Sequence, residues 1–519
     1  MSLLKNFATV GGATATSRIL GFVRDVFIAG ALGTGPIADA FFVAFRFPNL
    51  FRRLFAEGAF NSAFVPLYAR SLEGEGEDAA RRFGEEALSA LLTALLIFTA
   101  LAEIAMPILM YVMAPGFVSD PEKFDLTVFL TRIAFPYLAL VSLLAFYSGV
   151  LNARGRFAAA AFAPALLNVV LIAVLLLILW MGWANTRPAG VALTVGTLIG
   201  GVAQLALVVV AATRDDTLLR LRRPRLTPGV RRLVALGIPG VIAGGITQIN
   251  IVVGTMIASL APSAVSYLYY ADRLYQLPLG IVGIAIGVVL LPDLSRQLRA
   301  GRLDVADHTQ NRALEFAMAL TLPAAIALFV MAVPIINVLF QRASFTSSDT
   351  VETAAALAAF SLGLPAFVLI KVFSPGFFAR EDTRTPMWFA GAALVVNIAL
   401  SLALFPFLKH VGIALATSAA AWLNTALLAG TLARRGQFTT DAALKKRLPL
   451  LLLAAMLMGA VLFVAQWLMA PFLVDPALIV RAASVGVLVI GGVVVFAVFC
   501  QLTGAADFRG ALAKVLKRT

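Results

Sequence analysis

Residues 39–60, DAFFVAFRFPNLFRRLFAEGAF, and residues 17–25, SRILGFVRD, contain arginines within stretches that otherwise have the composition of membrane spans. These arginines are Arg18, Arg24, Arg46, Arg52 and Arg53. A charged side chain at the centre of a bilayer costs at least about 2.5 to 3.5 kcal/mol, and such side chains usually face a polar cavity or an opposite charge. The two stretches therefore predict a membrane protein with a functional pocket for anions between its helices.

The composition of the whole chain also indicates a protein that crosses the membrane many times. Of its 519 residues, 61% are hydrophobic and only 13% are charged, so its apolar surface is too large to be hidden in a soluble core. Apolar stretches of about 20 residues, long enough to span a bilayer, predict an all-α fold with fourteen transmembrane helices. The predicted spans are 7–32, 38–69, 84–113, 125–152, 158–182, 188–212, 230–260, 263–295, 310–333, 350–379, 386–407, 410–433, 448–470 and 476–503.

The distribution of the 41 Lys and Arg residues predicts the orientation of the chain. Twenty-eight lie in the termini and in the loops after the even-numbered spans, with Arg231, Arg232 and Arg312 at the adjoining span ends included. The opposite loops hold only four, Lys123, Arg187, Arg342 and Lys409. Because basic residues accumulate on the cytoplasmic side of a membrane, both termini are predicted to be cytoplasmic. The alternation accounts for the net charge of +14 without nucleic acid as a partner. The arginine-rich segment 213–232 is expected to lie along anionic membrane lipids.

The two halves of the chain match each other at a shift of 226 to 229 residues, which indicates an internal duplication. VPLYAR (65–70) aligns with LPDLSR (291–296). Further pairs in the same order are Arg46 with Arg273, Pro107 with Pro334, Pro136 with Pro365, Arg154 with Arg380 and Asn168 with Asn397. The alternative is that common residues match by chance.

Each copy of this repeat contains six predicted spans, so both copies enter the membrane in the same sense. The predicted organisation is two parallel six-helix lobes around a central cavity, followed by two additional helices. The corresponding domains are an N-terminal lobe (1–212), a basic cytoplasmic linker (213–229), a C-terminal lobe (230–435) and the last two spans with the cytoplasmic tail (436–519).

The charges within the first, second and eighth predicted spans do not balance. Six arginines, Arg18, Arg24, Arg46, Arg52, Arg53 and Arg273, face four carboxylates, Asp25, Asp39, Glu57 and Asp272. Planar guanidinium groups bind phosphate oxygens through two parallel hydrogen bonds. The surplus therefore favours a cationic cavity for a diphosphate, and the alternative is that the arginines extend to the membrane surface or form structural ion pairs.

No catalytic arrangement emerges from the sequence, so the chain is not expected to be an enzyme. A serine or cysteine nucleophile needs a neighbouring base, and no histidine lies in the interior of a predicted span. His308 and His410 fall in predicted loops without a metal-binding partner, and Cys500 is the only cysteine. No phosphate-binding GxxxxGK[ST] motif occurs. We therefore expect neither a cofactor nor a metal.

Five strings carry a resemblance to a known family. They are SRILGFVRD (17–25), ADAFFVAFRFPNLFRRLFAEGAFNSAFVP (38–66), FAPALLNVV (162–170), YYADRLYQLPLG (269–280) and VLLPDLS (289–295). The chain resembles the MurJ (MviN) lipid II flippases of bacterial peptidoglycan synthesis, which belong to the multidrug/oligosaccharidyl-lipid/polysaccharide exporter superfamily. The resemblance implies alternating-access export of lipid II, an undecaprenyl-diphosphate-linked disaccharide peptide, across the inner membrane. It also implies that the last two helices form a groove for the lipid tail.

The resemblance further implies roles for individual residues. Arg18, Arg24, Arg52 and Arg273 would bind the substrate, with Arg24, Arg52 and Arg273 holding the diphosphate and Arg18 also shaping the cavity. Asp39 would act at a gate on the periplasmic side. The remaining cavity residues would be Asp25, Arg46, Arg53, Glu57 and Asp272. Cell-wall synthesis enzymes are the protein partners that such a transporter implies.

The energy source predicted for this export is the membrane potential. A diphosphate carries about two negative charges, and each gains roughly 2.3 kcal/mol per 100 mV on leaving an interior-negative cytoplasm across the full field. Some relatives bind sodium through acidic residues of the seventh and eleventh spans. Residues 230–260 and 386–407 contain no Asp or Glu, so sodium coupling is not expected.

Four other functions remain open at this point. An exporter of another polyprenyl-diphosphate saccharide, such as an O-antigen unit, would need the same cavity. A drug or cation antiporter would favour surplus carboxylates, and a membrane transferase would need a metal-binding acidic pair. A scaffold for cell-wall enzymes would tolerate loss of the buried arginines.

Overall fold

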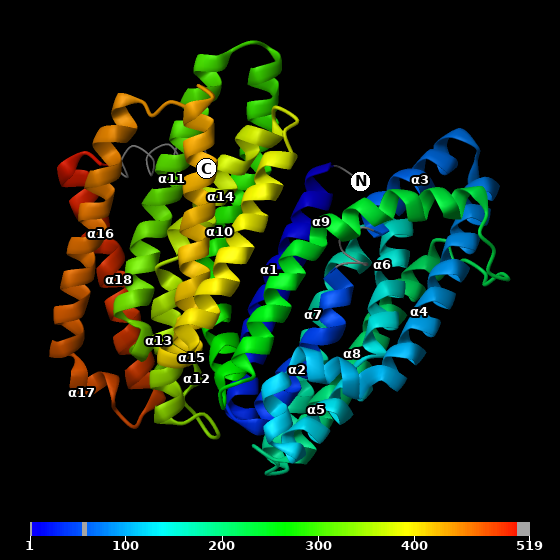
Figure 1. Cartoon of the computed structure of the whole chain (residues 1–519), viewed down its shortest axis with the longest axis horizontal. Helices are drawn as coiled ribbons and strands as arrows, with labels where there is room; N and C mark the ends of the chain where they lie inside the picture. The colour runs from blue at the N-terminus through cyan, green and yellow to red at the C-terminus, as the bar shows by residue number, and fades with distance from the viewer. Residues whose placement is uncertain (1–2, 54–59, 506–519) are drawn as a thin grey trace. The chain divides into compact units, whose positions relative to one another are not determined.

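The structure, a computed structural model, describes residues 3–53 and 60–505, and the regular elements in these ranges are all helices (Figure 1). The predicted all-α fold class is therefore confirmed. The helices up to residue 258 are α1 (Leu3–Leu32), α2 (Pro36–Phe51), α3 (Phe60–Gly74), α4 (Glu77–Met113), the 3-10 helix η2 (Pro115–Ser119), α5 (Pro121–Ala134), α6 (Tyr137–Ala153), α7 (Ala158–Trp180), α8 (Arg187–Arg214) and α9 (Pro228–Ala258). The helices that follow are α10 (Ala264–Arg299), α11 (Leu303–Val330), α12 (Ala332–Phe340), α13 (Ser347–Ser361), α14 (Leu364–Phe378), α15 (Arg384–Arg434), α16 (Ala442–Leu468), α17 (Ala470–Leu473) and α18 (Leu478–Thr503).

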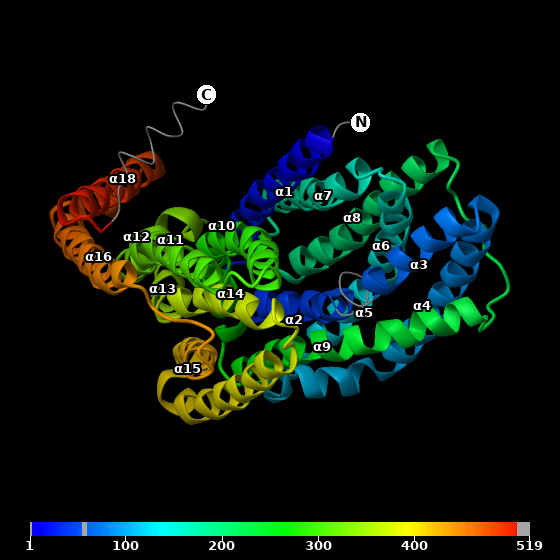
Figure 2. The same ribbon diagram turned by 90° about the horizontal axis from the view of Figure 1, so that it is seen from above.

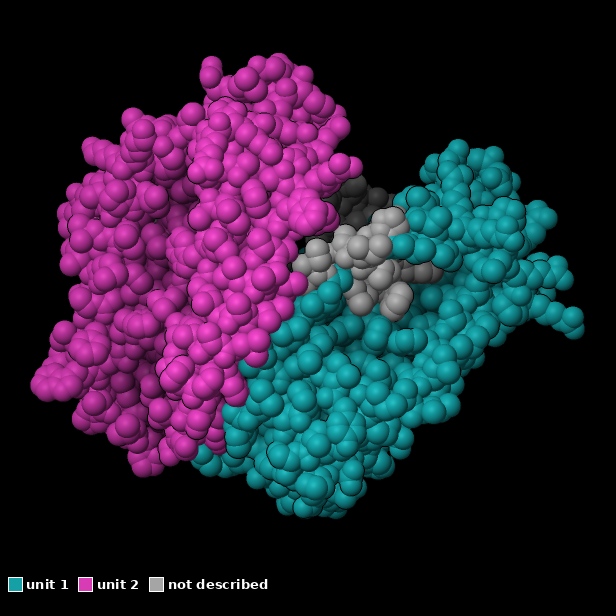
Figure 3. Space-filling model, in the orientation of Figure 1, with its two compact units in different colours: residues 1–266, 342–346 teal, residues 267–341, 347–519 magenta. Residues whose placement is uncertain are grey.

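The chain forms two compact units, which Figure 3 shows in different colours. The first unit runs to Ser266 and also includes Arg342–Thr346, and the second comprises Tyr267–Gln341 and the residues from Ser347 onward. The boundary at Ser266 differs from the repeat-based boundary at residue 229, because α9 packs against α3 and α4. The division into two six-helix repeats remains a prediction.

In the first unit, α1 packs along α7, and α2 packs along α5. The turn between α1 and α2 requires glycine at residue 33, which has a left-handed φ of +62°. A β-carbon at this position would lie 2.3 Å from the backbone oxygen of Ser344. The Ser344 N–H also donates to the carbonyl of Gly30 at 3.2 Å. The segment Arg342–Thr346 is thereby fixed against the end of α1.

The second unit has a continuous apolar core that includes the last helices of the chain. Leu314 and Met318 of α11 and Met458 of α16 belong to one buried cluster with Leu488 of α18. Figure 2 shows α16 and α18 side by side, and α11 also packs against α16. The two helices that follow the predicted repeat are therefore integral to this unit.

Nine helical stretches within the described residues are long and apolar enough to cross a membrane, so the chain is a multi-pass membrane protein. Each of the fourteen predicted spans overlaps a helix or two consecutive helices, but the number of spans itself stays a prediction. The helix α1 has 30 residues and is not one of the nine. Its internal charges, which include Arg24 and Asp25, lower its mean hydropathy.

Proline divides two predicted spans at positions that correspond in the repeat. The span 125–152 consists of α5 and α6, which meet at Pro136, and the span 350–379 consists of α13 and α14, which meet just before Pro365. Proline lacks the N–H that would continue the hydrogen-bond ladder. The same break therefore occurs in both halves.

The expectation that His410 lies in a loop is wrong. His410 is buried within α15, directly after the sharp break at Lys409, where φ is 47°. Its Nε2 lies 2.9 Å from the carbonyl oxygen of Glu352. The apolar sequences on both sides of the break bring this histidine into the helix packing.

Candidate functional site

Arg24 of α1 is buried in the first unit and is held by neighbouring polar groups. Its Nη2 donates to Asp25 Oδ1 at 2.7 Å, and its Nη1 donates to Asn168 Oδ1 of α7 at 2.9 Å. The amide nitrogen of Asn168 in turn donates to the carbonyl of Ser17 at 3.0 Å. The guanidinium group is therefore oriented by two helices.

Asp39 lies in the first turn of α2 and is completely buried. Both of its carboxylate oxygens accept hydrogen bonds. Lys123 Nζ of α5 forms an ion pair with its Oδ2 at 2.7 Å. Its Oδ1 accepts from the backbone N–H of Ser266 at 2.9 Å and from the Ser266 hydroxyl, and Oδ2 also accepts from the Ser263 N–H at 3.1 Å. Lys123 lies over the Phe117 ring, 3.9 Å from its centroid. Asp39 thus connects α2 and α5 to the segment that begins α10.

The second half of α2 and the turn directly after it carry two further arginines of the predicted cavity. Arg46 Nη1 donates to the Thr255 hydroxyl of α9 at 2.5 Å, and Arg52 Nε donates to Asn49 Oδ1 at 2.9 Å. Residues 52 and 53 form a π-helical turn after Pro48. Proline and π-helical turns interrupt regular helix geometry, and π-helical turns are frequent at functional sites.

Arg18 and Arg53, also predicted for the cavity, are both exposed. The Arg18 side chain makes no hydrogen bond or ion pair with any residue that the structure describes. Glu57 lies outside the described residues.

Asp272 and Arg273 are half-buried on α10 of the second unit. Arg273 Nη2 donates to the Tyr269 hydroxyl at 3.1 Å, and its guanidinium carbon lies 4.6 Å from the centre of the Tyr269 ring. Asp272 accepts a hydrogen bond from the Gln276 side chain, one helical turn later. An aromatic face next to a guanidinium group provides cation–π stabilisation and fixes its plane.

The structure brings Arg24 together with Asp25, but it assigns Asp39 to Lys123 rather than to an arginine. Lys123, Asn168 and Thr255 were not predicted as site residues. Two of them had a signal in the sequence: Lys123 is one of four basic residues in the loops poor in positive charge, and Asn168 matches Asn397 in the repeat. Within the described residues, no group of three His, Cys, Asp or Glu side chains could hold a metal ion.

The model of one protein family, "Lipid II flippase MurJ", matches residues 28–481, which is most of the chain. The chain belongs to the MurJ lipid II flippase family. A probable lipid II flippase MurJ of Rhizobium meliloti is 55% identical over 456 residues, covering 88% of this chain and 85% of the relative. The lipid II flippase MurJ of Burkholderia cenocepacia is 36% identical over 445 residues, covering 84% of this chain and 85% of the relative.

Solved structures show the same architecture. A MurJ lipid II flippase in an inward closed conformation aligns with a TM-score of 0.78 at 25% identity, covering 95% of this chain and 98% of the MurJ chain. An inward-facing multidrug resistance MATE family transporter of the MOP superfamily aligns with a TM-score of 0.63 at 15% identity, covering 81% of this chain and 96% of that transporter. The second likeness shows a shared fold alone.

Proposed function

We propose that this chain transports lipid II from the cytoplasmic to the periplasmic leaflet of the bacterial inner membrane. The observation that carries this proposal is the family match over residues 28–481, supported by relatives up to 55% identical that are named as lipid II flippases. Transport needs no catalytic residues, and the relatives are transporters. Both termini would lie in the cytoplasm, as the distribution of basic residues predicts.

The proposed role of the arginines is to hold the diphosphate. Arg24 is buried and oriented by Asp25 and Asn168, so a phosphate oxygen that replaced the Asp25 carboxylate would meet a guanidinium group already in place. Arg52 and Arg273 would add further donors, and the exposed Arg18 would contribute charge. Since Lys123 already neutralises Asp39, Asp39 is not available to neutralise these arginines.

The proposed role of Asp39 is at a gate. Its four hydrogen bonds connect α2, α5 and the start of α10, so relative movement of these elements would have to break a buried charged network. The remaining cavity residues, Asp25, Arg46, Arg53, Glu57 and Asp272, would tune the charge around the substrate. Residues 436–519 would provide the groove for the lipid tail.

The proposed transport of lipid II also implies partners for the chain and an arrangement of its two lobes. The two lobes would be parallel repeats, 1–212 and 230–435, that alternate in access around one cavity. Anionic membrane lipids would contact the linker 213–229, and cell-wall synthesis enzymes would receive the exported precursor.

Complementation tests the proposed function. Arg24→Ala, Arg52→Ala and Arg273→Ala should each fail to support growth of a strain depleted of its own lipid II flippase, at normal protein levels. Arg296→Ala is the matched control, because Arg296 is exposed and pairs with Asp293 at the end of α10, and it should support growth. Rescue by all three cavity variants would contradict the assignment of the diphosphate site.

A further inference from the structure

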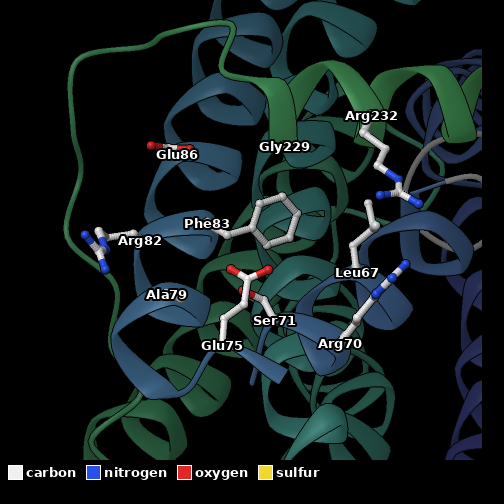
Figure 4. Close-up of a pocket in the computed structure, with 10 residues that line it drawn as sticks. All are labelled: Leu67, Arg70, Ser71, Glu75, Ala79, Arg82, Phe83, Glu86, Gly229 and Arg232. Carbon is white, nitrogen blue, oxygen red and sulfur yellow. The ribbon is translucent and has the colours of Figure 1, made fainter. Parts of the chain in front are cut away.

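A cavity of about 540 Å³ lies in the first unit where the end of α3, the beginning of α4 and the first turn of α9 meet. Figure 4 shows its lining, which comprises Leu67, Arg70, Ser71, Glu75, Ala79, Arg82, Phe83, Glu86, Gly229 and Arg232. None of these residues belongs to the proposed diphosphate site. The lining contains three arginines and two glutamates, so its net charge is positive.

The chain builds the walls of this cavity with specific contacts. Gly229 lies so close to α4 that a β-carbon on it would be 3.0 Å from the Phe83 ring. Thr227, the residue before α9, accepts from the Val230 N–H and donates to Glu86 at 2.8 Å. The beginning of α9 is thereby anchored to α4, and the carboxylate of Glu86 is already engaged.

The linker that precedes α9 is also fixed to α4. The buried Glu85 carboxylate accepts from the Arg222 side chain at 2.5 Å and from the backbone N–H of Arg220 at 3.3 Å. The hydroxyl of Ser89 accepts from the Arg222 N–H at 2.8 Å. These contacts hold the segment that leads to the cavity, so the position of Arg232 relative to α3 is defined.

Arg70 and Arg232 are left with exposed guanidinium groups at one side of the cavity, and Figure 4 shows them on either side of Leu67. Neither side chain makes a hydrogen bond or ion pair with any described residue. The Glu75 carboxylate lies below Phe83 in the same view. Arg70 and Arg232 come from different helices, line the same cavity and form no ion pair with the carboxylates there. An anion that bound both guanidinium groups would provide the missing negative charge.

The internal repeat gives an independent comparison. Arg70 corresponds to Arg296 in the second half, and there Asp293, three residues earlier, accepts from Arg296 at 3.1 Å. At the position that corresponds to Asp293, the first half has Leu67. The second half therefore has a carboxylate that pairs with its arginine. The first half has none at the corresponding position, which lies at the edge of the cavity.

The residues that follow Arg232 on α9 indicate which anion the two arginines would bind. Directly after Arg232, the α9 side chains Val234, Leu236 and Ile238 are apolar and exposed. The arginines thus lie at the boundary between a polar end and an apolar surface, which in a membrane protein is the level of the lipid headgroups. We propose that Arg70 and Arg232 bind the phosphate of an anionic phospholipid at the predicted cytoplasmic surface. This site is independent of the proposed transport of lipid II.

Native mass spectrometry of the full chain in uncharged detergent tests this site with short-chain phosphatidylglycerol and phosphatidylcholine. The wild type should bind phosphatidylglycerol in preference, and Arg70→Ala combined with Arg232→Ala should weaken binding of the first phosphatidylglycerol molecule about tenfold. Arg299→Ala combined with Arg302→Ala removes the same charge from two exposed positions outside the cavity and the linker, and it should have a smaller effect. Unchanged binding in the first double variant would overturn the proposal.

Two single variants that keep all the arginines test the pairing argument. Leu67→Asp restores the pair found at Asp293 and Arg296 and should weaken phosphatidylglycerol binding while all arginines remain. Glu75→Gln removes a competing carboxylate and should leave binding equal or stronger. Equal effects of Leu67→Asp and Glu75→Gln would contradict the pairing argument. Displacement of the lipid by inorganic phosphate at the same concentration would assign the site to soluble phosphate and overturn the lipid assignment.

Discussion

At the scale of single residues, the buried charged side chains of the first unit are paired in two different ways. Asp39 and Lys123 are both buried and satisfy each other, whereas Arg24 is buried with one carboxylate and one amide. A buried ion pair adds little net stability compared with apolar residues, but removing one partner leaves an uncompensated charge. The Asp39 pair therefore makes the arrangement of α2 and α5 sensitive to a change at either position.

The first prediction concerns this pair. Asp39→Asn should lower the free energy of unfolding by about 3 to 5 kcal/mol, because Lys123 stays buried without a carboxylate. The double variant Asp39→Asn with Lys123→Met should recover at least half of this loss. Thermal unfolding of the purified protein in detergent measures both effects. Strictly additive losses would show that the two side chains do not stabilise each other.

A second prediction concerns Asp382, in the turn between α14 and α15. The backbone N–H of Thr385, followed by side-chain hydrogen bonds from Arg435 and Thr385, lowers the pKa of the Asp382 carboxyl to about 2. Because the ordinary pKa is 3.8, Asp382 stabilises the fold above about pH 4, and this contribution is lost as the pH falls toward 2.

Asp382→Asn should therefore lower the unfolding midpoint at pH 7 and flatten its dependence on pH between about 4 and 2. Unfolding curves at a series of pH values measure this difference. Asp304→Asn is the control, since the Asp304 side chain is exposed and makes no hydrogen bond within the described part of the chain. If the unfolding midpoint of Asp382→Asn fell as steeply with pH below about 4 as that of the wild type, the stabilising role of the Asp382 carboxylate would be contradicted.

At the scale of elements, helix positions were predictable because the bilayer requires about 20 apolar residues per crossing. The breaks near Pro136 and Pro365 were not predicted, because the apolar composition continues through both and gives single spans at 125–152 and 350–379. The sequence did not predict the partner of Asp39, because Lys123 is 84 residues away and only the packing of α2 on α5 brings them together. His410 was misplaced because a break of one residue, at Lys409, replaces the expected loop.

The turn between α1 and α2 gives a third prediction. Gly33→Ala should destabilise the first unit by more than about 2 kcal/mol, since the side chain would be strained at φ +62° and would collide with the Ser344 backbone. Gly182→Ala is a matched control, because Gly182 has φ +69° and no atom within 4 Å of the added carbon. Its cost should be about 1 kcal/mol. Equal unfolding midpoints for the two variants would contradict a role for the Ser344 contact.

At the scale of the whole molecule, the family and the all-α fold could be predicted from the sequence. The arginine-containing strings carry the resemblance that the family match over residues 28–481 confirms. The division of the chain into two compact units could not be predicted from the sequence. The repeat assigns the seventh span to the second half, but its helix, α9, packs with the first unit. Repeats record how a chain arose, whereas compact units depend on which apolar faces meet.

The fourth prediction concerns the energy of transport. Two negative charges that cross the full field gain roughly 4 to 5 kcal/mol per 100 mV. If about a third of this energy acts on the slowest step, collapsing the potential should slow lipid II flipping about tenfold. Proteoliposomes with an imposed potassium diffusion potential, with and without valinomycin, measure this rate. An unchanged rate would exclude the potential as the driving force.

The segment Arg342–Thr346 belongs to the first unit although residues 267–341 belong to the second. During synthesis, the first unit therefore remains incomplete until the ribosome has translated far beyond α9. A gene divided after Ser266 would yield an N-terminal fragment whose helix turn at Gly33 lacks its packing partner, and only co-expression with the complementary fragment would supply it.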